Sequence, residues 1–123
     1  MEIQERTLAF GIKIIKYIDR LPKTVAGAVL AKQLIRSGTS IGANMEEADG
    51  ASSKNDFINK VTIARKESRE TWYWLKLICK AELVQNKSNQ EELLALIDEA
   101  YELMKVLSAI INKAKEKKTV IDK

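Results

Sequence analysis

Histidine is absent from the 123 residues of this chain. It is the usual general acid or base near neutral pH, and it activates the serine or cysteine of many nucleophilic enzymes. Di-iron sites in helical bundles also use it, because they combine glutamates with Glu-x-x-His motifs. The carboxylates of Glu47, Glu67 and Glu70 form only a loosely patterned, oxygen-only set. No glycine-rich phosphate loop follows a predicted strand. We therefore expect no enzymatic activity, no metal and no cofactor.

Cysteine, proline and long apolar runs are scarce as well. The single cysteine, Cys79, excludes a disulfide within one chain, and its apolar neighbours indicate a buried structural thiol. One proline and five glycines leave few interruptions, so the secondary-structure elements must be long. No apolar run reaches the length of a membrane span, and charges lie where a signal peptide needs an apolar segment. These absences predict a cytoplasmic protein.

The composition that remains is typical of one soluble helical domain covering residues 1–123. Hydrophobic residues make up 46% of the chain and charged residues 31%, which suits a packed core rather than a disordered segment. The spacing of apolar residues predicts helices at about residues 3–20, 24–49, 54–84 and 89–115. Pro22 ends the first helix, because proline has no amide donor, and Gly50 ends the second. The expected N-caps of the later helices are Thr24, then Ser52 or Ser53, then Ser88 or Asn89.

Each predicted helix carries apolar residues at alternating spacings of three and four, which keep one seam of a helix against a partner. The first seam is Phe10, Ile14, Tyr17 and Leu21, widened into a broad face by Leu8, Ile12 and Ile15. The second is Ala31, Leu34, Gly38, Ile41, Met45 and Ala48. The third is Phe57, Val61, Ala64, Ser68, Thr71, Leu75 and Ile78. The fourth is Leu93, Ile97, Ala100, Met104, Leu107, Ile111 and Ala114, flanked by Leu96, Leu103 and Ile110. The chain is therefore predicted to be all-α, an antiparallel up-down-up-down four-helix bundle.

The third helix carries two further stripes, one on each shoulder of its seam. One shoulder is basic with a single aromatic residue: Arg65, Arg69, Tyr73, Lys76 and Lys80. The other is apolar and includes Ile63, Trp74 and Leu77. A helix inside a monomeric bundle needs only one apolar face. The apolar shoulder therefore covers a neighbouring helix or meets another subunit, and we expect Ile63, Trp74 and Leu77 to form a subunit interface.

Positive charge is concentrated in the middle of the chain. The net charge is +4, and residues 52–87 hold eight Lys/Arg against four Asp/Glu. A second basic cluster closes the sequence at Lys113, Lys115, Lys117 and Lys118. A solvated outer face, or an interaction of the last lysines with the negative helix end, explains such charges without any ligand. The functional interpretation is a nucleic-acid contact by Arg65, Arg69, Lys76, Lys80, Lys113 and Lys117.

Polar residues within the predicted helices form a third set of candidates: Ser40, Asn44, Glu47, Glu67 and Glu70. Buried polar groups need partners, so we interpret this set as structural. Hydrogen bonds or ion pairs between helices would fix their register, with Arg36, Lys66 or Arg65 as partners.

These residues also carry a family resemblance. Ser40, Asn44 and Glu47 match a Ser-x-x-x-Asn pattern followed three positions later by an acidic residue, and Asp56 and Phe57 match the start of the next helix. A Lys-Glu-x-x-Glu-Thr-x-x-Trp-Leu run is matched by Lys66, Glu67, Glu70, Thr71, Trp74 and Leu75. Ala48, Asp49 and Gly50 fit the family's following positions only in part. In these motifs the chain resembles the small bacterial four-helix-bundle proteins encoded in intervening sequences of 23S rRNA genes.

The resemblance implies an antiparallel four-helix bundle that assembles as a ring-like homo-oligomer, pentameric in relatives of known structure. Relatives include the basic accessory protein of diversity-generating retroelements, which works with a reverse transcriptase and nucleic acid. We therefore expect a non-enzymatic, homo-oligomeric accessory protein that binds RNA or DNA. The alternative is a protein-binding scaffold without nucleic-acid affinity, whose basic face meets an acidic partner. A ring that repeats a weakly binding stripe gains affinity, because later contacts become intramolecular.

Overall fold

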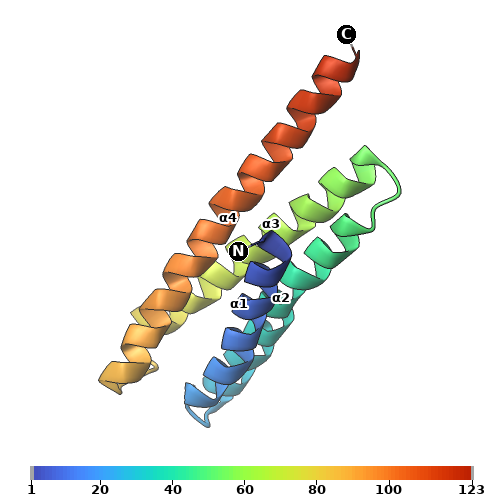
Figure 1. Ribbon diagram of the computed structural model, residues 1–123. Helices are drawn as coiled ribbons and strands as arrows, with labels where there is room; N and C mark the ends of the chain where they lie inside the picture. Colours follow the sequence, from blue (N-terminus) through green and yellow to red (C-terminus); the bar gives the residue numbers. More distant parts are fainter. Residues whose placement is uncertain (1, 123) are drawn as a thin grey trace.

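The computed structural model describes the backbone of residues 2–122 and the side chains of residues 2–116. Within that part, the chain forms four α-helices without any strand, joined by short connections (Figure 1). They are α1 (Ile3–Tyr17), α2 (Val25–Asp49), α3 (Lys54–Lys80) and α4 (Lys87–Asp122), and a single 3₁₀ turn, η1 (Ile18–Arg20), follows α1. The predicted all-α four-helix bundle is confirmed.

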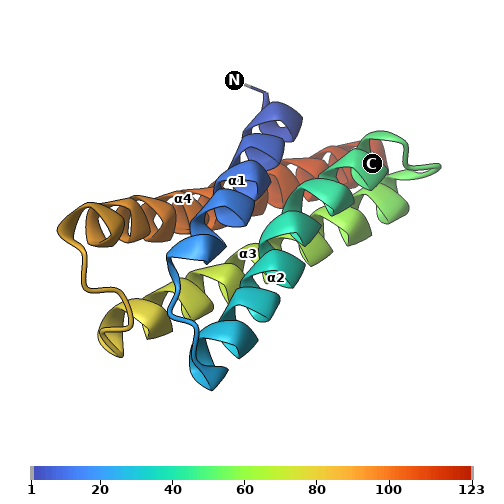
Figure 2. The same cartoon turned by 90° about the horizontal axis from the view of Figure 1, so that it is seen from below.

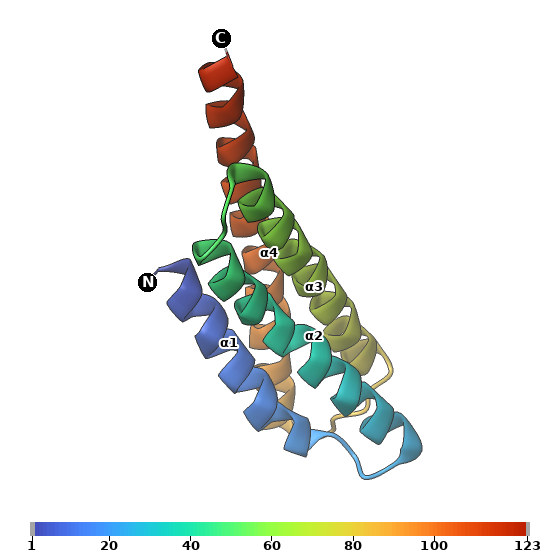
Figure 3. The same cartoon turned by 90° about the vertical axis from the view of Figure 1, so that its right-hand side faces the viewer.

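Helix α3 has extensive contacts with both α2 and α4, whereas α1 lies against α2 and touches α4 sparingly. Figure 2 shows α1 on one side of the bundle, and Figure 3 shows that the C-terminal turns of α4 project beyond the other helices. The connections from α1 to α2 and from α3 to α4 lie at one end of the bundle, and the turn between α2 and α3 lies at the other (Figure 1). Neighbouring helices are therefore antiparallel.

Side-chain caps begin the later helices. Thr24 Oγ1 accepts a hydrogen bond from the Gly27 amide at 3.1 Å, and Ser53 Oγ accepts one from the Asp56 amide at 3.0 Å. The expected cap of the last helix, Ser88 or Asn89, is wrong. Asn86 Oδ1 accepts from the Asn89 amide at 3.0 Å, so the helix already begins at Lys87. Asn86 is therefore the N-cap, since an N-cap side chain accepts a hydrogen bond from the amide two or three residues later in the first turn.

Helix α3 ends at Lys80, four residues before the predicted end at 84. Two backbone bonds close it: the Leu83 amide donates to the Ile78 carbonyl at 3.2 Å, and the Glu82 amide donates to the Cys79 carbonyl at 3.1 Å. This pair of bonds defines a Schellman motif, which requires a left-handed backbone conformation at the residue that follows the C-cap. Glu82 supplies it with a φ of 56°. The sequence has no glycine at this position, and glycine is the usual sign of such an ending.

The predicted seam of α3 lies in the core. Its members from Val61 to Ile78 are fully buried, and Phe57 is half-buried. On α4 the buried line differs from the predicted one, because Leu96 and Leu103 are buried while Ile97 and Met104 are half-buried. Because α4 packs mainly against α3 and has few contacts with α1, the residues of α4 that are buried are those on its α3-facing side.

The first helix leaves much of its apolar face uncovered. Phe10, Ile14 and Tyr17 are buried as expected, but Leu8, Ile12 and Ile15 are 63%, 44% and 51% exposed. The apolar face of this helix is therefore broader than the part that packs into the core. The outer side of α1 stays open because α2 is its only extensive neighbour within the described part of the chain.

Two polar contacts hold α1 to α4 where apolar contacts are few. Arg6 donates from Nε and Nη2 to the two carboxylate oxygens of Glu99, both at 2.8 Å. The hydroxyl of the fully buried Tyr17 donates to the Asn89 carbonyl at 2.9 Å. Burial, more than the nearby Glu92 carboxylate, raises the pKa of Tyr17 to about 12. The hydroxyl therefore remains a hydrogen-bond donor throughout the neutral pH range.

The end of α3 generates a stability prediction. Glycine adopts left-handed φ angles without the Cβ clash that an L side chain meets there. We expect Glu82→Gly to raise the free energy of unfolding by about 0.5–1 kcal/mol and the Tm by about 2–4 °C. The measurement is thermal unfolding followed by circular dichroism. Glu82→Ala is the matched control, because it removes the same carboxylate and keeps the Cβ. An equal gain in both variants would assign the effect to charge and contradict the account.

Candidate nucleic-acid interface

Helix α3 sorts its charges between its two shoulders. Glu67 and Glu70 face α2, where Arg36 pairs with both carboxylates; Arg36 Nη1 lies 3.3 Å from Glu67 Oε2. Glu70 also accepts a hydrogen bond from the indole of Trp74 at 3.3 Å. The carboxylates of this part of α3 are thus neutralised on the α2 side. The opposite shoulder, next to α4, keeps its positive charge.

The other polar candidates act within α2 or reach α3. Ser40 donates to the Arg36 carbonyl, and Asn44 Nδ2 donates to the Ser40 carbonyl at 2.9 Å. These bonds stay inside α2, as side chains of this kind do in helix interiors, so they do not join two helices as we expected. Glu47 reaches α3, where its carboxylate lies 3.7 Å from Lys60 Nζ. Arg36, Glu47, Glu67 and Glu70 therefore link α2 to α3.

A groove runs between α3 and α4 on the basic shoulder, and we call it the α3–α4 groove. It consists of two adjoining hollows of about 460 and 530 Å³ that share Arg69, Met104 and Ser108. Its other lining residues are Thr62, Arg65, Lys66, Trp72, Tyr101, Lys105, Ala109 and Asn112. Four lining side chains are basic, and none of those described is acidic. The groove therefore presents an electropositive surface to solvent.

Aromatic rings lie among these cations. The rings of Trp72 and Tyr101 are 5.6 Å apart and tilted, so they join α3 to α4. Lys76 Nζ lies 3.8 Å from the centre of the Trp72 ring, and Lys105 Nζ lies 5.4 Å from that of Tyr101. Lys105 also pairs with Glu102 at 3.2 Å. Both lysines are held near the groove by contacts of the cation–π type.

The groove gathers only part of the predicted nucleic-acid contacts. Arg65 and Arg69 line it, and Arg65 Nη1 donates to Ser108 Oγ at 3.4 Å. Lys76 reaches it through its contact with Trp72, and Lys80 is exposed at the end of α3. Lys113 instead lines a separate hollow together with Lys54, Phe57, Ile110 and Ala114. The side chain of Lys117 lies outside the described residues.

The contribution of α4 to this groove was not predicted from the sequence. Tyr101 and Lys105 are one helical turn apart, so they project from the same face of α4. That spacing is visible in the sequence, but only the packing of α4 against α3 shows that the pair meets Trp72 and Arg69. Trp72 packs against the core while one side of it lines the groove.

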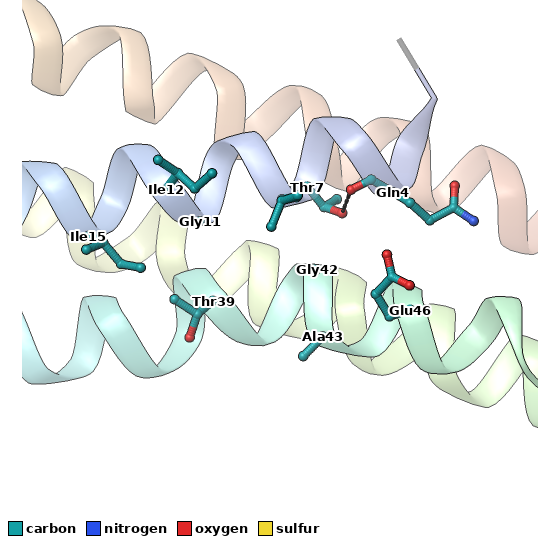
Figure 4. A pocket seen from close by; sticks show the side chains of 10 residues that line it. Gln4, Thr7, Gly11, Ile12, Ile15, Thr39, Gly42, Ala43 and Glu46 are labelled. Atoms are coloured by element: carbon teal, nitrogen blue, oxygen red, sulfur yellow. Dashed lines mark hydrogen bonds between the residues drawn. The ribbon is translucent and has the colours of Figure 1, made fainter.

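A second, apolar groove lies between α1 and α2. The α1–α2 groove has a volume of about 300 Å³ and is lined by Gln4, Thr7, Leu8, Gly11, Ile12, Ile15, Thr39, Gly42, Ala43 and Glu46. Figure 4 shows the two helices side by side, with Gln4 and Glu46 at one end of the groove and Ile15 and Thr39 toward the other. The helices approach closely here, since a Cβ on Gly42 would touch the Thr7 backbone at 3.4 Å.

The apolar shoulder of α3 is less open. Ile63 and Leu77 are 40% and 37% exposed, while Trp74 is half-buried against the core. The chain thus presents apolar side chains to solvent on both α1 and α3, and Val25 and Val29 on α2 are exposed as well.

Neither a metal site nor a membrane span emerges from the described residues. Among them, no group of three or more Cys, Asp or Glu side chains is arranged to hold a metal ion. In the same part of the chain, no helix combines the length and the apolarity needed to cross a membrane.

Comparison with known proteins identifies the family. The model of the 23S rRNA-intervening sequence proteins matches residues 1–109. The chain belongs to this family. A similar solved structure is a protein of unknown function from the S23 ribosomal protein family of Bacteroides thetaiotaomicron, 38% identical, with a TM-score of 0.80. The likeness covers 89% of this chain and 98% of that protein. Among curated protein sequences, none matches this chain.

The family match spans almost the whole candidate site. Residues 1–109 include every lining residue of the α3–α4 groove except Asn112, and all of the α1–α2 groove. Both surfaces therefore belong to the part of the chain that the 23S rRNA-intervening sequence family defines.

Proposed function

We propose that this protein is a non-enzymatic, cytoplasmic accessory protein that binds RNA or DNA and acts as a homo-oligomer. The observation that carries the proposal is the α3–α4 groove, whose described lining includes Arg65, Lys66, Arg69 and Lys105 and no carboxylate. A concave surface of one charge sign attracts phosphate, and release of condensed counterions drives such binding. The family resemblance makes a reverse transcriptase a candidate protein partner.

The separation of acidic and basic side chains on α3 favours a function beyond solubility. Glu67 and Glu70 engage Arg36, so the acids of α3 nearest the groove are occupied on its other shoulder. Arg69 has no carboxylate partner among the ion pairs within the described part of the chain. A purely solvated surface needs no such separation, since mixed charges serve solubility equally well.

Exposed apolar surfaces support the oligomeric part of the proposal. Exposed apolar residues lie on every helix, and the two groups that we assign to subunit contacts are Leu8, Ile12 and Ile15 on α1 and Ile63 and Leu77 on α3. Two different surfaces on one chain favour a heterologous contact, in which the α1 surface of one copy meets the α3 surface of the next. Such contacts close into a ring when the rotation between copies permits. A ring repeats the α3–α4 groove and raises affinity for a long nucleic acid.

The groove predicts a charge-dependent loss of binding. Arg69→Glu with Lys76→Glu should abolish binding of a fluorescent RNA, with a segment of 23S rRNA as the first probe, in anisotropy titrations. The wild-type protein should lose affinity steeply with salt, by about 0.7 in log–log slope per phosphate contacted on a single strand. The matched control, Lys16→Glu with Lys23→Glu, makes the same change in net charge on exposed residues outside the groove and should keep most of the affinity.

Two results would contradict this interpretation. Binding that survives the Arg69 and Lys76 changes would place the nucleic acid elsewhere, with Lys113 as the next residue to test. Wild-type protein that binds neither RNA nor DNA at low salt would remove the nucleic-acid function. A scaffold that meets an acidic protein would then be the function to pursue.

The oligomer proposal predicts complementation between two variants. Leu8→Lys with Ile15→Glu disables the α1 surface, and Ile63→Lys with Leu77→Glu disables the α3 surface; both pairs leave net charge unchanged. Each variant alone should be a helical monomer by light scattering. Their mixture should form a heterodimer, because one intact surface of each kind remains. Including Trp74→Glu in the second variant tests whether this half-buried residue also belongs to the interface.

A monomeric wild-type protein at about 100 μM would contradict the proposal. A mixture of the two variants that stays monomeric would also contradict it, because the two surfaces would not be partners.

A further inference from the structure

We propose that the α3–α4 groove takes single-stranded nucleic acid, with an unpaired base stacked on Tyr101 and the backbone held by the arginines beside it. This inference rests on the proposed nucleic-acid function and specifies the ligand of the same groove. Its observation is the aromatic pair formed by Trp72 and Tyr101 at one end of the basic lining.

Tyr101 is placed to receive a base. Tyr101 is 44% exposed although it lines the groove. Trp72 packs against one side of it with ring centres 5.6 Å apart, so the tyrosine ring is supported from within the bundle. A supported ring with an open side is the platform on which proteins stack bases of a single strand.

Cations surround this platform at short range. Lys105 lies one turn from Tyr101 on α4, and Arg69 lies across the groove on α3. Arg65 follows one turn further along α3, about 6 Å away along the helix axis. A strand whose base stacks on Tyr101 can therefore place successive phosphates against cations on both walls. Ser108 and Asn112 add neutral hydrogen-bonding groups on the α4 wall.

Duplex nucleic acid cannot use these features. Its bases are paired and stacked inside, so its outer surface offers phosphates and groove edges. A duplex lying over α3 and α4 would contact the basic rim and leave the aromatic pair unused. Basic residues alone would suffice for that contact. The presence of Tyr101 over Trp72 within the groove therefore favours a single strand over a duplex.

Lys76 and Lys105 cover the aromatic rings in the absence of ligand. Their ammonium groups lie 3.8 Å and 5.4 Å from the ring centres of Trp72 and Tyr101. A stacked base replaces the ammonium above a ring, and the flexible lysine side chain then turns to the adjacent phosphate. Lys76 thereby exchanges a cation–π contact for a charge-assisted one, whereas Lys105 also leaves its ion pair with Glu102 for a phosphate.

The test compares one strand with its duplex on matched variants. Fluorescence anisotropy at fixed low salt measures the affinity of the wild-type protein for a labelled 20-nucleotide oligo(U) strand and for a mixed-sequence RNA duplex of equal length. The single strand should bind at least about tenfold more tightly. Tyr101→Leu should weaken strand binding by about 5- to 100-fold and leave duplex binding unchanged. Tyr101→Phe should retain strand binding, because it keeps the ring.

Tyr73→Leu is the control for loss of a tyrosine, because Tyr73 is exposed on α3 but does not line the groove. It should leave both affinities unchanged. Equal affinity for strand and duplex, or Tyr101→Leu with unchanged strand binding, would overturn this inference and leave the proposed function standing. Failure of both probes to bind the wild-type protein would overturn the proposed function itself. Circular dichroism of Tyr101→Leu must match the wild type, and Tyr101→Phe supplies the comparison if it does not.

Discussion

The packing of α3 between α2 and α4 is the constraint on which the rest of this bundle depends. Its seam from Val61 to Ile78 is completely buried, and two of its members are small hydroxyl-bearing residues. Ser68 Oγ donates to the Ala100 carbonyl at 2.9 Å, and Thr71 Oγ1 donates to Ser37 Oγ at 2.8 Å. These bonds satisfy buried polar groups and tie α3 to both neighbours at once. No buried side-chain polar atom in the described part of the chain lacks a partner.

The rotation of α3 that buries this seam also decides where its charges point. The two glutamates nearest the middle of the helix face α2 and meet Arg36, while Arg65 and Arg69 face α4. Exposed ion pairs of this kind contribute little stability, so their main consequence is electrostatic. They occupy the carboxylates on one shoulder, and the groove on the other shoulder remains basic. The rotation of α3 about its axis therefore determines both the buried core and the position of the basic groove.

The spacing of apolar residues correctly predicted the buried side of a helix that is covered along its whole length. It did not predict which apolar residues stay exposed where a helix has few neighbouring helices. The seam of α3 was readable because α2 and α4 cover it along its length. Leu8, Ile12 and Ile15 have the same apolar character as core residues, and only the sparse contact between α1 and α4 leaves them exposed. Arg65 and Arg69 were identifiable as one stripe. Tyr101 and Lys105 could not be identified as groove residues from the sequence. Which residues line a groove depends on how α3 and α4 are rotated relative to each other, and a pattern within one helix does not contain that information. The end of α3 at Lys80 was not predicted for a different reason. Glu82 occupies the left-handed position after the helix, where glycine usually indicates a helix end.

The central claim is that nucleic acid lies in the α3–α4 groove, and a cross-linking map tests it most directly. A single-stranded RNA carrying 4-thiouridine at every third position would be bound to the wild-type protein, irradiated and digested, and the attachment sites would be assigned by mass spectrometry. The account predicts adducts concentrated on Trp72, Tyr101 and adjacent residues of α3 and α4. Adducts concentrated around Lys113, or on the α1–α2 groove, with unmodified peptides from the α3–α4 groove, would contradict it.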